Sequence, residues 1–131
     1  MKTVTSKDGT IIAFDQFGSG SVVILVDGAL QYRAFDQGML PLAELLSQHF
    51  TVIHYDRRGR GDSTDSQPYE LEREIEDIES LIDVADGSAF LYGISSGAAL
   101  AFEAVLALPG KVKRPRYPLN ERPASRCLHL F

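Results

Sequence analysis

One ten-residue segment restricts the fold of this chain more than any other. Residues 88–97 read Ser-Ala-Phe-Leu-Tyr-Gly-Ile-Ser-Ser-Gly, so an apolar strand-like run leads directly into a pentad that begins and ends with glycine. An apolar segment with helical character, residues 98–108, follows at once. A sharp turn from strand to helix needs glycine on both sides, because a side chain there would collide with the neighbouring strand or helix. The segment therefore predicts a strand, a tight turn centred on Ser95 and a helix.

The rest of the chain alternates between strand-like and helix-like patterns. Residues 22–26 are apolar at every position, which is typical of a strand buried on both faces. Strands that alternate with helices predict an α/β fold with a mostly parallel sheet and helices on both faces. The predicted strands cover residues 2–5, 11–17, 22–26, 51–55 and 88–92, and the predicted helices cover residues 36–48, 70–86 and 98–108.

Composition narrows the classes of protein to which the chain can belong. With 131 residues, 44% of them hydrophobic, the chain can bury one core. The formal net charge of −5 argues against nucleic acid or an anionic membrane as a partner. No apolar run approaches the ~18 residues of a membrane span, and the N-terminus lacks the apolar core of a signal peptide. A single cysteine, Cys127, excludes an intramolecular disulfide framework. We therefore expect a cytoplasmic protein.

The last part of the chain differs in composition from the rest. Residues 1–109 carry 7 Lys and Arg against 17 Asp and Glu, whereas residues 110–131 carry 6 Lys and Arg against one acidic residue. Pro115 and Pro118 would remove the backbone donors that a central strand needs. We therefore divide the chain into a domain at residues 1–110 and a basic, proline-rich tail at residues 111–131. We interpret the tail as not native to the fold, the product of a shifted reading frame or a truncated gene.

Three segments, in this order along the chain, resemble the α/β-hydrolase family. Residues 22–30 resemble its third strand and oxyanion loop, residues 55–63 its fourth strand and Gly-rich loop, and residues 93–97 its nucleophile elbow. A Gly-x-Ser-x-Gly pentad alone arises by chance, but three such segments in the right order are specific. The resemblance implies the N-terminal portion of that fold, truncated after the fifth strand.

The resemblance also implies a reaction and a role for each residue of the elbow. It points to an esterase-like serine hydrolase that acts on a small carboxylic ester or related acyl substrate without a metal or organic cofactor. Ser95 would be the nucleophile, and Ser96 is the less favoured alternative. The N–H groups of Ser96 and Ala29, or of Leu30 in place of Ala29, would form the oxyanion hole. Epoxide hydrolases and dehalogenases resemble one another in using Asp at the elbow, so a serine argues against those two reactions.

The glycines of these loops are expected to serve backbone geometry alone. They are Gly28, Gly93 and Gly97.

The oxyanion loop departs from a common family pattern at its first residue. Many members have His-Gly at this point, whereas this chain has Asp27 followed by glycine. A carboxylate close to the oxyanion would oppose it unless the carboxylate is turned away or paired. Arg33 and Arg57 are the candidate partners. Alternatively, Asp27 only orders the loop by accepting backbone hydrogen bonds.

The residues that would activate the serine cannot be assigned. In the family the catalytic acid and histidine follow later strands, so we expect impaired activity. We interpret His49 and His54 as structural, and the proline-rich tail offers nothing that would hold His129 against the serine. A non-catalytic remnant and a module that binds a small ligand are the alternatives. The open edge of the fifth strand also predicts self-association.

One further cluster of charge lies on the predicted helix at residues 70–86. We interpret its acidic residues as the solvated face of an amphipathic helix. They are Glu70, Glu72, Glu74, Glu76, Asp77 and Glu79.

Overall fold

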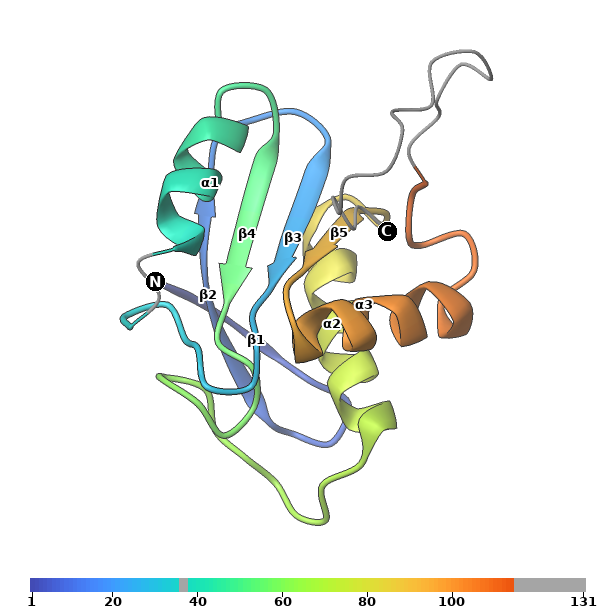
Figure 1. The fold of residues 1–131 in the computed structure, drawn as a ribbon. Coiled ribbons are helices and arrows are strands. Elements are labelled where there is room, and N and C mark those ends of the chain that lie inside the picture. The colour runs from blue at the N-terminus through green and yellow to red at the C-terminus, as the bar shows by residue number, and fades with distance from the viewer. Residues whose placement is uncertain (36–37, 115–131) are drawn as a thin grey trace.

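The computed structural model describes residues 1–35 and 38–114. Five strands form one sheet in the order β1-β2-β4-β3-β5, and three helices pack against it (Figure 1). The strands are β1 (Lys2–Thr5), β2 (Ile11–Phe17), β3 (Val22–Val26), β4 (Thr51–Tyr55) and β5 (Phe90–Gly93). The helices are α1 (Met39–Leu46), α2 (Leu71–Ala85) and α3 (Ser96–Ala107).

The sheet is mostly parallel, as the sequence predicts. β4, β3 and β5 are parallel neighbours. β2 is antiparallel to both of its neighbours, β1 and β4, so it alone runs against the other strands. The β1–β2 hairpin closes at Gly9, whose φ of 90° is a left-handed conformation that glycine adopts without strain. Because β3, β4 and β5 point the same way, their carboxyl ends meet at one edge of the sheet.

β3 separates two apolar layers. Val22, Ile24 and Val26 belong to the larger core, which β3 shares with α2 and α3. Val23 and Leu25 belong to a smaller core with α1. Successive side chains of a strand point to opposite faces, so burial on both faces explains why this strand is apolar throughout. Helices therefore lie on both faces of the sheet, with α1 on one and α2 and α3 on the other (Figure 1).

After α3 the chain returns to the edge of the sheet beside β5. The Ala89 N–H donates to the carbonyl of Lys111 at 2.9 Å, and the Lys113 N–H donates to the carbonyl of Ala89 at 2.8 Å. Ala89 and Val112 form a parallel bridge. Residues 111–113 thus pair with the residue that precedes β5. The domain boundary at residue 110 and the origin of the tail stay predictions. Residues 115–131, with Cys127 and His129, lie outside the described residues.

No helix in the described part of the chain is both long enough and apolar enough to cross a lipid bilayer.

Candidate active site

Ser95 lies in the tight turn between β5 and α3. Its backbone has φ 54° and ψ −125°, and within the described residues it is the only non-glycine residue with a positive φ. This conformation is costly for a residue with a side chain and is typically held in place by the structure around it. The Ala98 N–H donates to the carbonyl of Ser95 at 3.0 Å, so the serine stands at the beginning of α3.

The two glycines of the pentad lie where no side chain fits. A Cβ atom on Gly93 would lie 2.5 Å from the carbonyl oxygen of Gly97 and 2.6 Å from the Cα of Ala98. A Cβ atom on Gly97 would collide with the carbonyl oxygens of Val26 and Asp27. Both positions therefore require glycine: Gly93 because the first residues of α3 lie directly against it, and Gly97 because α3 begins in contact with the end of β3.

The two predicted oxyanion donors come from the residue after Ser95 and from the loop that follows β3. Ser96 is the first residue of α3, where N–H groups have no helical acceptor. Ala29 follows Gly28, and a Cβ atom on Gly28 would lie 3.5 Å from the Cβ of Ser95. Among the described residues, neither the Ser96 N–H nor the Ala29 N–H donates to a protein acceptor. Both amides are free for a ligand, and their role as oxyanion donors stays a prediction.

Side chains that the sequence analysis did not single out order the oxyanion loop. The Gly28 N–H donates to Gln31 Oε1 at 3.0 Å, and the Gln31 N–H donates back to the Gly28 carbonyl at 3.3 Å. Arg60, from the loop after β4, donates from Nε to the Ala29 carbonyl at 2.7 Å. The loop that presents the Ala29 N–H is thus tied to the neighbouring loop.

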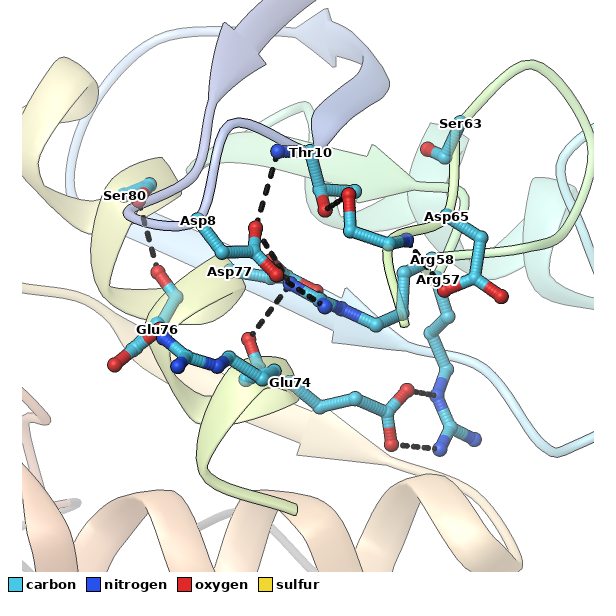
Figure 2. A network of polar contacts seen from close by, with 12 residues as sticks. Asp8, Thr10, Arg57, Arg58, Ser63, Asp65, Glu74, Glu76, Asp77 and Ser80 are labelled. Atoms are coloured by element: carbon cyan, nitrogen blue, oxygen red, sulfur yellow. Dashed lines mark hydrogen bonds and ion pairs between the residues drawn. The ribbon is translucent and has the colours of Figure 1, made fainter. Parts of the chain in front are cut away.

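Arg57 connects this region to α2 (Figure 2). Its Nε and Nη2 donate to the two carboxylate oxygens of Glu74 at 2.8 and 2.7 Å. Its Nη1 donates to Ser96 Oγ at 3.0 Å and to the Asp27 carbonyl at 3.2 Å. Burial by itself would raise the pKa of Glu74, but the Arg57 guanidinium and the Tyr69 hydroxyl, 2.7 Å away, hold that pKa below its ordinary value.

The solvated-face interpretation of α2 is wrong at two of its acidic residues. Glu74 and Asp77 are only 2% and 1% exposed. Asp77 accepts from Nε and Nη2 of Arg58 at 2.8 and 2.7 Å, and Asp8 accepts from Arg58 Nη1 at 2.8 Å (Figure 2). The signal in the sequence is two adjacent arginines in one loop and two acidic residues three positions apart, on one face of a helix.

Asp27 has a different partner from the two that the sequence suggested. Its carboxylate is fully buried, and Oδ2 accepts from Nε2 of His54 on β4 at 2.8 Å. Arg57 contacts only the backbone carbonyl of Asp27, and Arg33 pairs instead with Asp56 at 3.2 Å and with other carboxylates. The expectation of an arginine partner is therefore wrong. The two side chains meet because Asp27 directly follows β3, and β3 is hydrogen-bonded to β4, which carries His54. The sequence does not reveal that these two strands are neighbours.

Neither described histidine contacts Ser95. His54 directs Nε2 to Asp27. His49 lies between α1 and the start of β4, at the end of the parallel strands opposite to Ser95. Within the described residues, no histidine hydrogen-bonds the serine hydroxyl.

A pocket of about 580 Å³ opens between the oxyanion loop and the loop after β4. Ala29, Leu30 and Tyr32 line it from the first loop, and Arg60 and Asp62 line it from the second. Ala29, one of the two predicted oxyanion donors, therefore lines this pocket, whereas Ser95 and Ser96 are not among its lining residues.

Comparison with known proteins agrees with this geometry. Residues 10–126 match the model of a family described as the alpha/beta hydrolase family. An α/β hydrolase from Sphaerobacter thermophilus is 58% identical, with a TM-score of 0.77 over 82% of this chain and 40% of that one. A thermophilic esterase from Thermogutta terrifontis is 27% identical, with a TM-score of 0.71 over 85% of this chain and 42% of that one. An epoxide hydrolase from Vigna radiata is 27% identical, with a TM-score of 0.74 over 93% of this chain and 41% of that one.

The chain spans about two fifths of the length of each of these proteins. The family match nevertheless covers most of this chain, and the same residues form the parallel strands and the strained turn at Ser95. The chain therefore belongs to the α/β-hydrolase family.

Proposed function

We propose that this chain carries the nucleophile and the oxyanion site of a serine hydrolase that acts on carboxylic esters or related acyl compounds. The observation that carries the proposal is the backbone conformation of Ser95, whose φ is positive. The glycines at positions 93 and 97 allow this tight turn, because neither position has room for a side chain. A strained residue at the mouth of a site is a recurrent feature of catalytic centres. The free amides of Ser96 and Ala29 beside it support acyl transfer, because a developing oxyanion needs two such donors.

The proposed reaction proceeds in two steps. Ser95 Oγ attacks the carbonyl carbon of the ester, and its proton passes to a base. The carbon–oxygen bond to the leaving alcohol then breaks, and the alcohol departs with one proton. Water attacks the resulting acyl-serine, which releases the carboxylic acid and restores the hydroxyl.

The fold alone does not decide the reaction, since the similar structures include an esterase and an epoxide hydrolase. The serine at the elbow favours acyl chemistry over epoxide opening, because the resemblance assigns Asp to that position in epoxide hydrolases. The pocket of about 580 Å³ has room for a small acyl compound, and Ala29 lines it whereas Ser95 does not, so it supports binding next to the oxyanion loop and not contact with the nucleophile.

We further propose that the chain by itself reacts slowly. No described histidine contacts Ser95, so the hydroxyl has no assigned base. Loss of a triad member typically costs about 10⁴ to 10⁶ in rate, and the oxyanion site retains a residual acceleration.

Labelling with a fluorophosphonate tests the proposal, because covalent capture requires an activated serine. We expect slow labelling of the unmodified chain, located at Ser95 by peptide mass mapping, and none at this position in Ser95→Ala. Ser96→Ala is the matched control, since it removes the neighbouring hydroxyl and should still be labelled at Ser95, although at a lower rate. Labelling of Ser96 in the Ser95→Ala protein would assign the nucleophile to Ser96 and contradict the proposal.

The second candidate is a non-catalytic remnant or a module that binds a small ligand in this pocket. The absence of a histidine beside Ser95 among the described residues favours it. Binding of a short carboxylic ester without turnover, at equal strength in the unmodified chain and in Ser95→Ala, together with no labelling, would support this candidate.

A further inference from the structure

We propose that Arg57, Arg60 and Glu74 are positioning residues that keep the two halves of the oxyanion site at a fixed separation. The inference rests on the proposed function. The two halves, Ser96 and Ala29, come from segments far apart in the sequence. Their separation must stay fixed for both amides to bind one oxygen atom.

Arg57 attaches the first half of the site. Its Nη1 lies 3.0 Å from Ser96 Oγ and 3.2 Å from the carbonyl of Asp27, so one nitrogen holds the start of α3 and the start of the oxyanion loop together. The other two nitrogens of the guanidinium, Nε and Nη2, donate to the carboxylate of Glu74, and the Arg57 side chain is only 5% exposed. Because Glu74 fixes the planar guanidinium, the start of α3 cannot shift relative to the oxyanion loop without breaking a hydrogen bond to Arg57.

Arg60 attaches the second half of the site. Its Nε donates to the carbonyl of Ala29 at 2.7 Å. Its Nη1 lies 3.6 Å from Oε1 of Glu74, the oxygen that also accepts from Arg57 Nε. One buried carboxylate therefore accepts two hydrogen bonds from Arg57 and forms a longer ion pair with Arg60. Each arginine contacts one of the two residues predicted to donate to the oxyanion.

Stability alone is a poor explanation for this arrangement. A buried ion pair is often replaced by apolar side chains without loss of stability, because desolvation offsets the attraction between the charges. Arg58 is the internal comparison. It lies next in the chain, is equally buried and pairs with Asp77, yet its hydrogen bonds reach neither Ser96 nor the oxyanion loop.

The experiment compares Arg57→Lys with Arg58→Lys in the full chain. Each variant keeps the positive charge and loses the planar guanidinium group, which can donate to several acceptors at once. The saturating rate of fluorophosphonate labelling at Ser95 and the apparent Kd of the probe are measured, and urea unfolding gives the folded fraction for correction. We expect Arg57→Lys to lower the saturating rate about 10- to 100-fold with the apparent Kd unchanged. Arg58→Lys should lose stability and keep the rate of its folded molecules.

A double-mutant cycle identifies the contact through which Arg57 acts. Ser96→Ala removes the Oγ acceptor and leaves the Ser96 N–H in place. We expect it to lower the labelling rate, and we expect the double variant Arg57→Lys/Ser96→Ala to be no slower than Arg57→Lys alone, because both changes break one contact. Multiplicative effects would overturn the assigned contact.

The outcomes separate the two proposals. Equal saturating rates in Arg57→Lys and Arg58→Lys, with the unmodified chain labelled at Ser95, would overturn the positioning role and leave the proposed function intact. If the unmodified chain is not labelled at Ser95, the proposed function fails and the positioning role fails with it.

Discussion

At the scale of single residues, the candidate site combines a strained backbone with buried charge. Ser95 has a φ of 54°, and the surrounding structure holds it there through contacts that exclude a side chain at Gly93 and Gly97. Strain of this kind costs of order 1–3 kcal/mol and must be offset by the rest of the fold. Glu74 is buried, which by itself would raise its pKa, but Arg57, whose Nε lies 2.8 Å from Oε1, holds that pKa below its ordinary value and keeps the carboxylate ionised.

The backbone strain at Ser95 predicts a difference between two substitutions. Ser95→Gly relieves the strain, whereas Ser95→Ala keeps it, and both remove the hydroxyl. Relief of the strain should raise the free energy of unfolding by about 1–3 kcal/mol, whereas the greater freedom of glycine in the unfolded chain lowers it by about 0.5–1 kcal/mol. We therefore expect Ser95→Gly to be more stable than Ser95→Ala by about 1 kcal/mol. Urea unfolding of the two variants measures the difference. A more stable alanine variant would show that the turn is not strained.

The charge of Glu74 predicts how stability depends on pH. Its pKa in the folded state lies below the ordinary value of 4.5, so its contribution to the free energy of unfolding is present above about pH 4.5 and is lost as the pH falls through the lower, folded-state pKa. Glu74→Gln should cost about 3–5 kcal/mol at pH 7, because Arg57 is left buried without a counter-ion. The stability difference between the two proteins should shrink below pH 4.5. Urea unfolding at pH 7 and at pH 3 checks this, and a difference that grows at pH 3 would contradict it.

At the scale of elements, the site exists because α3 begins in contact with the end of β3. Gly97 meets the carbonyl oxygens of Val26 and Asp27, so the first turn of the helix lies directly against the strand. The Ile94 N–H donates to the Val26 carbonyl at 3.2 Å, which continues the pairing of β5 with β3 into the turn. This close packing brings the oxyanion loop, which continues from β3, next to Ser95.

The packing of α3 on β3 predicts different costs for two glycine substitutions. Gly97→Ala places its Cβ against backbone atoms that cannot move, so we expect a loss of about 1–3 kcal/mol or more from overpacking. Gly28→Ala is the matched control, because its Cβ would meet the end of the flexible Gln31 side chain at 2.8 Å and should cost less. Thermal unfolding of both proteins gives the comparison. Equal Tm values would show that the helix can shift.

At the scale of the whole molecule, the described residues leave most of the outer side of β5 without a partner strand. β5 lies at one end of the strand order, and in the described part of the chain its outer side is paired only through the bridge between Ala89 and Val112 (Figure 1). Phe90 and Tyr92 of β5 are half-buried on the face that α1 covers. Unpaired backbone groups beside partly exposed apolar side chains can template pairing with another chain.

We therefore propose that the protein self-associates through the β5 edge. Sedimentation velocity should show an average mass that rises with concentration. Tyr92→Lys should reduce this association, because a charge on an edge strand disfavours pairing. Leu45→Lys is the matched control, since Leu45 lies on α1 and is 62% exposed but is remote from the edge. Equal association in both variants, or a monomer at all concentrations, would exclude the β5 edge as the contact.

The order of strands and helices, the parallel sheet and the turn at Ser95 were all predictable from the sequence by itself. Strands β1 to β4 have the predicted bounds, and the continuous apolar run of β3 correctly predicted a strand buried on both faces. These features depend on local patterns, because periodicity and glycine placement reflect the backbone conformation of neighbouring residues. The family resemblance rested on the same local motifs.

Only the tertiary structure decided which charged residues meet. Arg57 and Glu74 are 17 positions apart, and Asp27 and His54 are 27 positions apart, so no local pattern connects them. Their pairing depends on which strands are neighbours and on the packing of α2 next to the loop that follows β4. The sequence therefore predicts the nucleophile and the turn that presents it, whereas the buried ion pair that ties Ser96 to the oxyanion loop becomes visible only when the chain is folded.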